Sequence, residues 1–238
     1  GSNFINEKGN IVDMAQPVIS RWANASNGLD ALLDPWNVVF GLAVFFLARV
    51  LGGLFIINNV RDDVLESRAS VQLVGNAVLF LVLFLTFFIH ILLGYGYAYD
   101  PETGVAAIVE GKYLQNLLDM WYVALVLLVG VVLLLYGIGR TVVSKTWRGG
   151  IWPAGIGTVL AVLALLLCAG WNNTCYYPSN EDLQSSLNIV NSCSSEFTLR
   201  TMAWVSLLIP FVLAYIAYAW RAIGKPIDKD EIKHGEAY

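Results

Sequence analysis

The sequence predicts an all-α integral membrane protein in which five transmembrane helices form a bundle. Of its 238 residues, 57% are hydrophobic and only 13% are charged, whereas soluble domains carry about 25% charged residues. Residues 69–99 contain no Lys, Arg, Asp or Glu and are apolar all round the expected helix. About 20 such residues cross the hydrocarbon core of a bilayer. Four further stretches of the chain repeat the pattern, which gives the five helices.

The first 35 residues form a polar, Asn-rich segment whose apolar patches are too short to span a bilayer. The segment lacks the basic stretch and apolar core of a signal peptide, so we expect it to lie at the membrane surface, with Trp22 at headgroup level. Its first residue is Gly1, which indicates either a cloning remnant or a start inside a longer protein. Asp34 and Pro35 then supply a helix cap and a first helical residue.

The five charge-poor stretches are expected to be helices, because backbone groups in lipid must be satisfied within the segment. Short charged loops at 61–68 and 140–150 and longer polar segments at 100–119 and 172–197 separate them. Small residues recur in the third and fourth stretches and favour close helix packing. Pro210 is expected to bend the fifth. The predicted spans are 36–59, 69–97, 120–139, 152–171 and 199–220.

The orientation follows from the basic residues of the flanking segments, since cytoplasmic loops carry the excess of Lys and Arg. One side holds nine and the other holds four. We therefore expect an extracytoplasmic segment at 1–35, a bundle at 36–221 with two extracytoplasmic loops, and a cytoplasmic tail at 222–238. The nine are Arg61, Arg68, Arg140, Lys145, Arg148, Arg221, Lys225, Lys229 and Lys233, and the four are Lys8, Arg21, Lys112 and Arg200.

Three residues, Arg49, His90 and Asp119, are candidates for an interface or structural role, and the first two lie inside the predicted spans. Arg49 lies near the middle of the first span, where a charge costs at least ~2.5 kcal/mol and should face protein or water. Its partner could be a backbone carbonyl, Asp119 at a helix end or another polypeptide, and a cofactor propionate or an anionic lipid is the functional alternative. His90 is the one histidine in a span, and we expect it to make a hydrogen bond between helices rather than to bind haem or metal.

Other chemistry finds no support in the sequence. It contains no metal-ligand spacing, phosphate-binding loop or nucleophile motif, so we assign no catalytic, cofactor-binding or metal-binding residue to this chain. It also lacks a basic stripe interleaved with aromatic residues, and we therefore expect no nucleic-acid partner.

The last third of the chain resembles a known family. Residues 192–202 read Ser-Cys-Ser-Ser-Glu-Phe-Thr-Leu-Arg-Thr-Met, and residues 209–215 read Ile-Pro-Phe-Val-Leu-Ala-Tyr. Together with the loop from Cys175, the tail from Lys225 and the Asp-Pro-Trp element at 34–36, they are similar to subunit II of cytochrome bd quinol oxidase, especially its Bacteroidetes branch. Members of that family are longer, so the chain resembles the C-terminal part of such a subunit.

The resemblance implies a place in a heterodimer of the bacterial cytoplasmic (inner) membrane, with the C-terminus in the cytoplasm. Such a complex oxidises quinol and reduces dioxygen to water. Its haems b and d belong to subunit I, so this chain is expected to hold no cofactor and to support subunit I, in contact with membrane lipids and in reach of quinone. Two alternatives stay open from the residues alone. One is a secondary transporter or channel, which would need a polar site at broken helices, and the other is a non-catalytic membrane scaffold.

Two cysteines, Cys175 and Cys193, lie in the loop that the orientation places outside, which is an oxidising compartment in a bacterium. A disulfide that closes a loop of this size would stabilise the folded protein by ~3 kcal/mol. We predict a disulfide between them, with two free thiols as the alternative. Cys168 lies inside the fourth span and is expected to stay unpaired.

Overall fold

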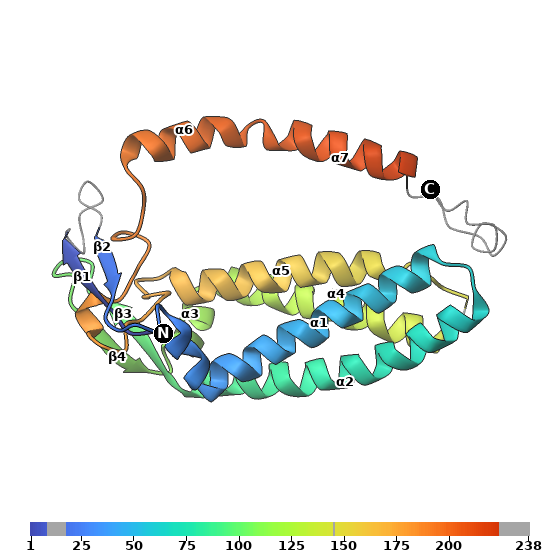
Figure 1. The fold of residues 1–238 in the computed structure, drawn as a ribbon, viewed down its shortest axis with the longest axis horizontal. Helices are drawn as coiled ribbons and strands as arrows, with labels where there is room; N and C mark the ends of the chain where they lie inside the picture. The colour runs from blue at the N-terminus through green and yellow to red at the C-terminus, as the bar shows by residue number, and fades with distance from the viewer. Residues whose placement is uncertain (9–17, 145, 224–238) are drawn as a thin grey trace. The chain divides into compact units, whose positions relative to one another are not determined.

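The computed structural model describes residues 1–8, 18–144 and 146–223 (Figure 1). These residues divide into two compact units, and the boundaries between the units fall within the long helices. Unit 1 comprises Gly1–Phe40, Leu85–Leu125 and Leu163–Ser206, and unit 2 comprises Gly41–Phe84, Val126–Val162 and the chain from Leu207 onward.

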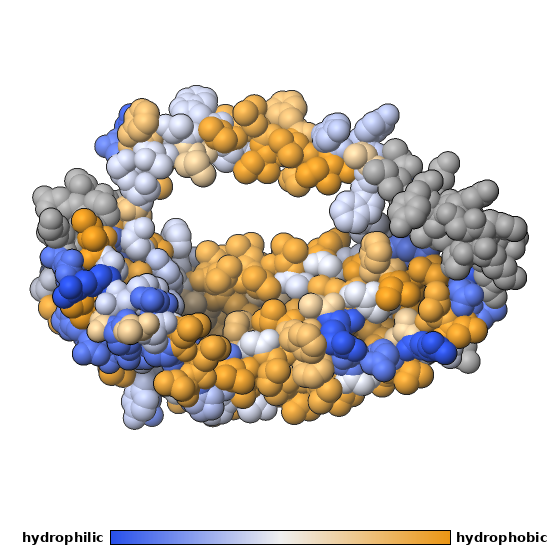
Figure 2. All heavy atoms as spheres, viewed as in Figure 1, coloured by the Kyte–Doolittle hydropathy of each residue, from blue (hydrophilic) through white to orange (hydrophobic). Residues whose placement is uncertain are grey.

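The predicted fold class is confirmed: the described part of the chain holds five stretches that are helical, long and apolar enough to cross a membrane. Hydrophobic side chains cover most of the helical surface in Figure 2, and hydrophilic ones gather around β1 and β2. The helices that form these stretches are α1 (Pro35–Asn59), α2 (Asp63–Leu93), α4 (Trp121–Val143), α5 (Ile151–Gly170), and, for the fifth, α6 (Glu196–Ser206) followed by α7 (Ile209–Ile223).

The second span begins earlier than predicted. Residues 61–68 were expected to be a charged loop, but α2 already starts at Asp63. The Asp62 carboxylate accepts hydrogen bonds from the backbone N–H groups of Val64 and Leu65, at 2.9 and 3.0 Å. It therefore caps the helix, and the charged residues form the first turns of α2 beyond the apolar run.

The second span also ends earlier than predicted, at Leu93 rather than near residue 97. Strand β3 (Tyr95–Tyr99) follows and pairs antiparallel with β4 (Ala106–Glu110). Tyrosine favours strands over helices, and Tyr alternates with Gly and Ala along β3. The uncharged run thus contains a helix and then a strand, which its hydropathy does not distinguish.

The fifth span is interrupted close to Pro210, the residue that was expected to bend it. The helix is interrupted at Leu207 and Leu208, and Pro210 is the second residue of α7. At this position the missing N–H of proline costs no helical hydrogen bond. No residue between Glu196 and Arg221 is buried.

The core of unit 2 is apolar. α1, α2, α4 and α5 all contribute to it, and Val50, Leu54 and Leu73 are completely buried. α4 and α5 approach each other closely at glycines: a Cβ atom added to Gly157 would lie 2.5 Å from the carbonyl oxygen of Gly130. This is the close packing that small residues permit in a membrane.

Unit 1 contains the strands and the short helices of the described residues. The N-terminal segment, expected at the membrane surface, contains β1 (Phe4–Lys8) and β2 (Ile19–Trp22), which pair antiparallel, and then a short 3-10 helix, η1 (Leu29–Leu33). The polar segment before the third span contains a further helix, α3 (Lys112–Asp119), and the loop after α5 contains η2 (Leu183–Ser185).

The described residues reach only the start of the predicted tail. Residues 222 and 223 are the last two of α7, and residues 224–238 lie outside the described part.

Candidate functional site

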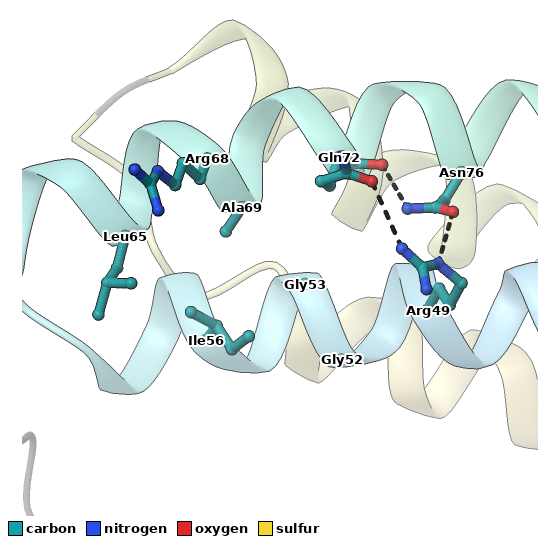
Figure 3. A pocket seen from close by; sticks show the side chains of 9 residues that line it. All are labelled: Arg49, Gly52, Gly53, Ile56, Leu65, Arg68, Ala69, Gln72 and Asn76. Atoms are coloured by element: carbon teal, nitrogen blue, oxygen red, sulfur yellow. Dashed lines mark hydrogen bonds between the residues drawn. The ribbon is translucent and has the colours of Figure 1, made fainter.

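A groove of about 380 Å³ lies between α1 and α2 in unit 2 (Figure 3). Its lining positions recur every three or four residues on each helix, so each set occupies one helical face. α1 contributes Arg49, Gly52, Gly53 and Ile56, and α2 contributes Leu65, Arg68, Ala69, Gln72 and Asn76.

Arg49 is held against α2 by two side-chain amides. Its Nε donates a hydrogen bond to Oδ1 of Asn76 at 2.9 Å, and its Nη2 donates a longer one to Oε1 of Gln72 at 3.4 Å. Asn76 is buried, and its own Nδ2 donates to the Gln72 backbone carbonyl at 2.6 Å, which fixes the orientation of the amide. The guanidinium also lies 5.8 Å from the centre of the Phe45 ring. Both amide partners are neutral, so the positive charge of Arg49 is not cancelled.

The sequence named no side-chain amide among the expected partners of Arg49, and the structure adds these two. A contact with another polypeptide stays a prediction. Asp119 belongs to unit 1, and its carboxylate accepts a hydrogen bond from Nδ2 of Asn172 at 3.2 Å. One signal in the sequence pointed to the amides, since Gln72 and Asn76 are four residues apart and share a helical face with Arg68.

The groove is open on the side of α1. A Cβ atom added to Gly52 would meet nothing within 4 Å, and one added to Gly53 would make only ordinary contacts with Leu73 and Ala69, at 3.8 and 3.9 Å. Arg68 is exposed, and Figure 3 shows its side chain running along α2 toward Leu65. The acidic residue two positions before it, Glu66, binds Arg148 at 2.5 Å.

His90 lies in unit 1, where its ring stacks on the indole of Trp36 with ring centres 3.6 Å apart and planes within 4°. The sequence predicted a contact between helices for His90, in the form of a hydrogen bond, and the contact that the structure gives is this stack of α2 on α1. A pocket of about 480 Å³ adjoins the pair and is lined by Trp36, Thr86, Ile89, His90, Leu93 and Gly94, none of them basic apart from the imidazole.

A polar network joins α3 to the end of α5. Asn116 is buried, and its Nδ2 donates to the backbone carbonyl of Cys168 at 2.9 Å and to the Thr174 hydroxyl at 2.8 Å. Its Oδ1 accepts from Asn172 at 3.1 Å, and Lys112 donates to the Asn172 carbonyl at 2.9 Å. Burial lowers the pKa of Lys112, although Asp119 acts in the opposite direction. The sequence carried one signal for this network, because residues 112, 116 and 119 fall on one face of a helix.

All three cysteines are free thiols in the structure. Cys168 and Cys175 are buried, and the half-buried Cys193 contacts the Val190 carbonyl through its sulfur at 3.1 Å. Burial raises the pKa of the Cys175 thiol to about 11. The bridge between Cys175 and Cys193 is therefore not formed here, and it stays a prediction.

Within the described residues, no group of three or more His, Cys, Asp or Glu side chains is arranged to hold a metal ion.

Comparison with known families identifies the chain. The family described as cytochrome bd terminal oxidase subunit II matches residues 8–223, a range that includes the five candidate spans. No curated protein matches the sequence.

Proposed function

Because the chain belongs to the family of cytochrome bd terminal oxidase subunit II, we propose that it supports a haem-bearing subunit I in oxidising quinol and reducing dioxygen to water. The family makes the chain part of a respiratory oxidoreductase, and the five apolar helices make it a multi-pass membrane protein. The observation that carries the proposal is the match over residues 8–223. It favours an oxidase subunit over the carrier and scaffold alternatives.

The exposed surface of the fifth span supports a protein partner. Trp204 and Phe211 are 75% and 74% exposed, and no residue of this span is buried. In a membrane such a surface is covered by lipid or by other helices, and helix association there depends on packing and hydrogen bonds rather than on the hydrophobic effect. We propose that this surface takes part in the heterodimer with subunit I.

The proposal places haems b and d in subunit I. Haem iron takes His, Cys, Met or Tyr ligands, and the haem propionates are anions that favour a cationic partner. His90 lies in unit 1 beside a pocket lined by no Lys or Arg, whereas Arg49 belongs to unit 2. These residues do not fit a haem site, so no step of the reaction is assigned to a haem on this chain.

Co-purification tests the proposed function. A tagged form of the chain, extracted from membranes in mild detergent, is expected to carry a second polypeptide and a haem spectrum that changes on reduction. The same purification from cells lacking subunit I is the control and is expected to give no haem signal. A colourless chain without a partner would contradict the proposal, and so would a haem spectrum that persists without subunit I.

We further propose that the basic loops face the cytoplasm, in a bacterial inner membrane. The connection between α4 and α5 contacts the one between α1 and α2 and the first turn of α2, since Arg148 binds the Glu66 carboxylate at 2.5 Å and the Val60 carbonyl at 3.3 Å. They therefore lie on one side of the membrane. The longer loops around α3 and η2 belong together in unit 1.

Single cysteines test this orientation in a Cys193→Ser background. The exposed residues Glu181 and Thr146 lie in the loops assigned to opposite sides. A membrane-impermeant maleimide added to intact cells is expected to label Glu181→Cys and to spare Thr146→Cys until the membrane is opened. The reverse labelling pattern would contradict the proposed orientation.

A further inference from the structure

We propose that the groove between α1 and α2 binds one anionic diacyl phospholipid, with its phosphate at Arg68 and its glycerol-ester carbonyls at Arg49 and Gln72. The lining contains two guanidinium groups and no carboxylate. The volume of about 380 Å³ is within the range of sites for small molecules, roughly 300–1,000 Å³.

Along the membrane normal, Arg68 and Arg49 are expected to lie in the same order as the phosphate and the ester carbonyls of such a lipid. α2 has 31 residues and is about 46 Å long, so it exceeds a hydrocarbon core of about 30 Å by about 8 Å at each end. Arg68 is five residues from the start of α2, near the boundary between headgroups and core, from which its long side chain can reach outward to a lipid phosphate. Gln72 is one turn, about 6 Å, deeper, on the side of Arg68 toward the bilayer centre, as the ester carbonyls lie relative to the phosphate in a diacyl lipid.

The donors at the deeper level suit a neutral acceptor. Arg49 shares the level of Gln72 and Asn76 because it is hydrogen-bonded to both. A guanidinium has five N–H donors, and the hydrogen bonds to these amides engage Nε and Nη2 only. Arg49 is also exposed, so ester oxygens of a lipid in the groove can reach its remaining N–H groups.

The shallower level suits an anion. Arg68 is exposed, and the carboxylate of Glu66 one half-turn away is bound to Arg148. Each basic side chain near an anionic membrane surface contributes ~1 kcal/mol of attraction, and basic pockets between transmembrane helices bind anionic headgroups. Gly52, Ile56 and Leu65 give the groove apolar walls for the glycerol and the first acyl segments. A neutral quinone would use the donors at Arg49 but leave Arg68 without a role.

Lipid binding to the purified complex that contains this chain tests the proposal. The complex is depleted of lipid in detergent and titrated with mixed micelles of phosphatidylglycerol or phosphatidylethanolamine, and bound lipid is counted by mass spectrometry. We expect one phosphatidylglycerol to be retained in preference to phosphatidylethanolamine. Arg68→Ala should weaken its binding about fivefold, and inorganic phosphate at equal concentration should not displace it.

A steric variant tests the same groove without removing a charge. Gly52→Leu would fill open space in the groove and is expected to exclude the lipid. Its control is Gly41→Leu on the same helix. A Cβ atom added to Gly41 also meets nothing within 4 Å, but Gly41 does not line the groove. Arg61→Ala is the control for Arg68→Ala, since Arg61 is exposed nearby and does not line the groove.

Several results would overturn the proposal. They are equal retention of the two lipids, equal loss of lipid in Arg61→Ala and Arg68→Ala, and full retention in Gly52→Leu. Chemical crosslinking of an acidic side chain of a partner subunit to a groove residue would assign the groove to that subunit instead. Extraction of a quinone in place of phosphatidylglycerol would assign it to the quinone.

Discussion

The two units of this protein are stabilised by different interactions. In unit 2 the buried side chains are almost all apolar, and α4 and α5 touch backbone to backbone at Gly130 and Gly157. In unit 1 many buried side chains are polar and hydrogen-bonded, among them Asn116 and Thr174. Lipid is as apolar as a helix surface, so helices in a membrane gain stability from close fit. An irregular loop must instead satisfy each buried backbone group.

The largest effect is expected where close fit is broken in unit 2. Gly157→Ala would place a Cβ atom 2.5 Å from the Gly130 carbonyl oxygen and 2.6 Å from the Leu134 nitrogen, both backbone atoms that move only with the helix. Overpacking of this kind costs ~1–3 kcal/mol. We expect a lower midpoint of thermal unfolding and a lower yield of assembled complex.

Gly155→Ala is the matched control on the same helix, because a Cβ atom there meets nothing within 4 Å. Alanine favours a helix over glycine by up to ~1 kcal/mol, so this variant is expected to be as stable as the parent or slightly more so. Equal destabilisation of the two variants would show that the approach of α4 and α5 does not depend on Gly157.

A comparable effect is expected where hydrogen bonding is broken in unit 1. Asn116→Ala removes the donor to the Cys168 carbonyl, one of the last four carbonyls of α5, which have no partner within the helix. It also removes the contacts to Thr174 and Asn172. Leaving a buried acceptor unsatisfied costs ~1–3 kcal/mol.

Thermal unfolding measures this cost, and Gln115→Ala on the exposed face of α3 is the control. We expect the midpoint to fall for Asn116→Ala and to stay near the parent value for Gln115→Ala. If Asn116→Ala is neutral, the network between α3 and α5 does not hold unit 1 together.

The same difference explains which parts of the fold could be predicted from the sequence. The five spans follow from long runs of apolar residues, a signal contained within each run. The hairpin of β3 and β4 was missed because residues 95–99 continue the uncharged run of α2, and their strand conformation depends on pairing with residues 106–110. The start of α2 was missed because the cap at Asp62 lies among charged residues that are also typical of a loop.

The candidate site was predictable in part. A charge inside a span marks a constrained position, and this singled out Arg49. Its partners, Gln72 and Asn76, depend on how α1 and α2 are rotated against each other, which the sequence does not specify. The groove beside them likewise depends on small residues at Gly52 and Gly53 facing α2, whereas the sequence equally allows them to face lipid.

For two thiols in the polar loop of unit 1, the sequence and the structure each make a prediction. In reduced protein, Cys193 is half-buried and Cys175 is buried with its pKa raised to about 11. The reactive species is the thiolate, and at pH 8 a thiol with a pKa of about 11 is almost entirely protonated. We expect iodoacetamide to label Cys193 first, and labelling of Cys175 to increase about tenfold per pH unit until the pH approaches 11.

Protein isolated without reductant tests the bridge predicted from the sequence. A disulfide between Cys175 and Cys193 would block both labelling reactions, and an unreduced digest would contain their peptides linked until reductant is added. Because the linked loop lies outside the spans, we expect its loss in Cys193→Ser to lower stability by at most ~3 kcal/mol, with the packing of unit 2 unchanged. Alkylation of both residues in the untreated protein would show that hydrogen bonds alone order the loop. Equal labelling rates in the reduced protein would show instead that Cys175 is not buried.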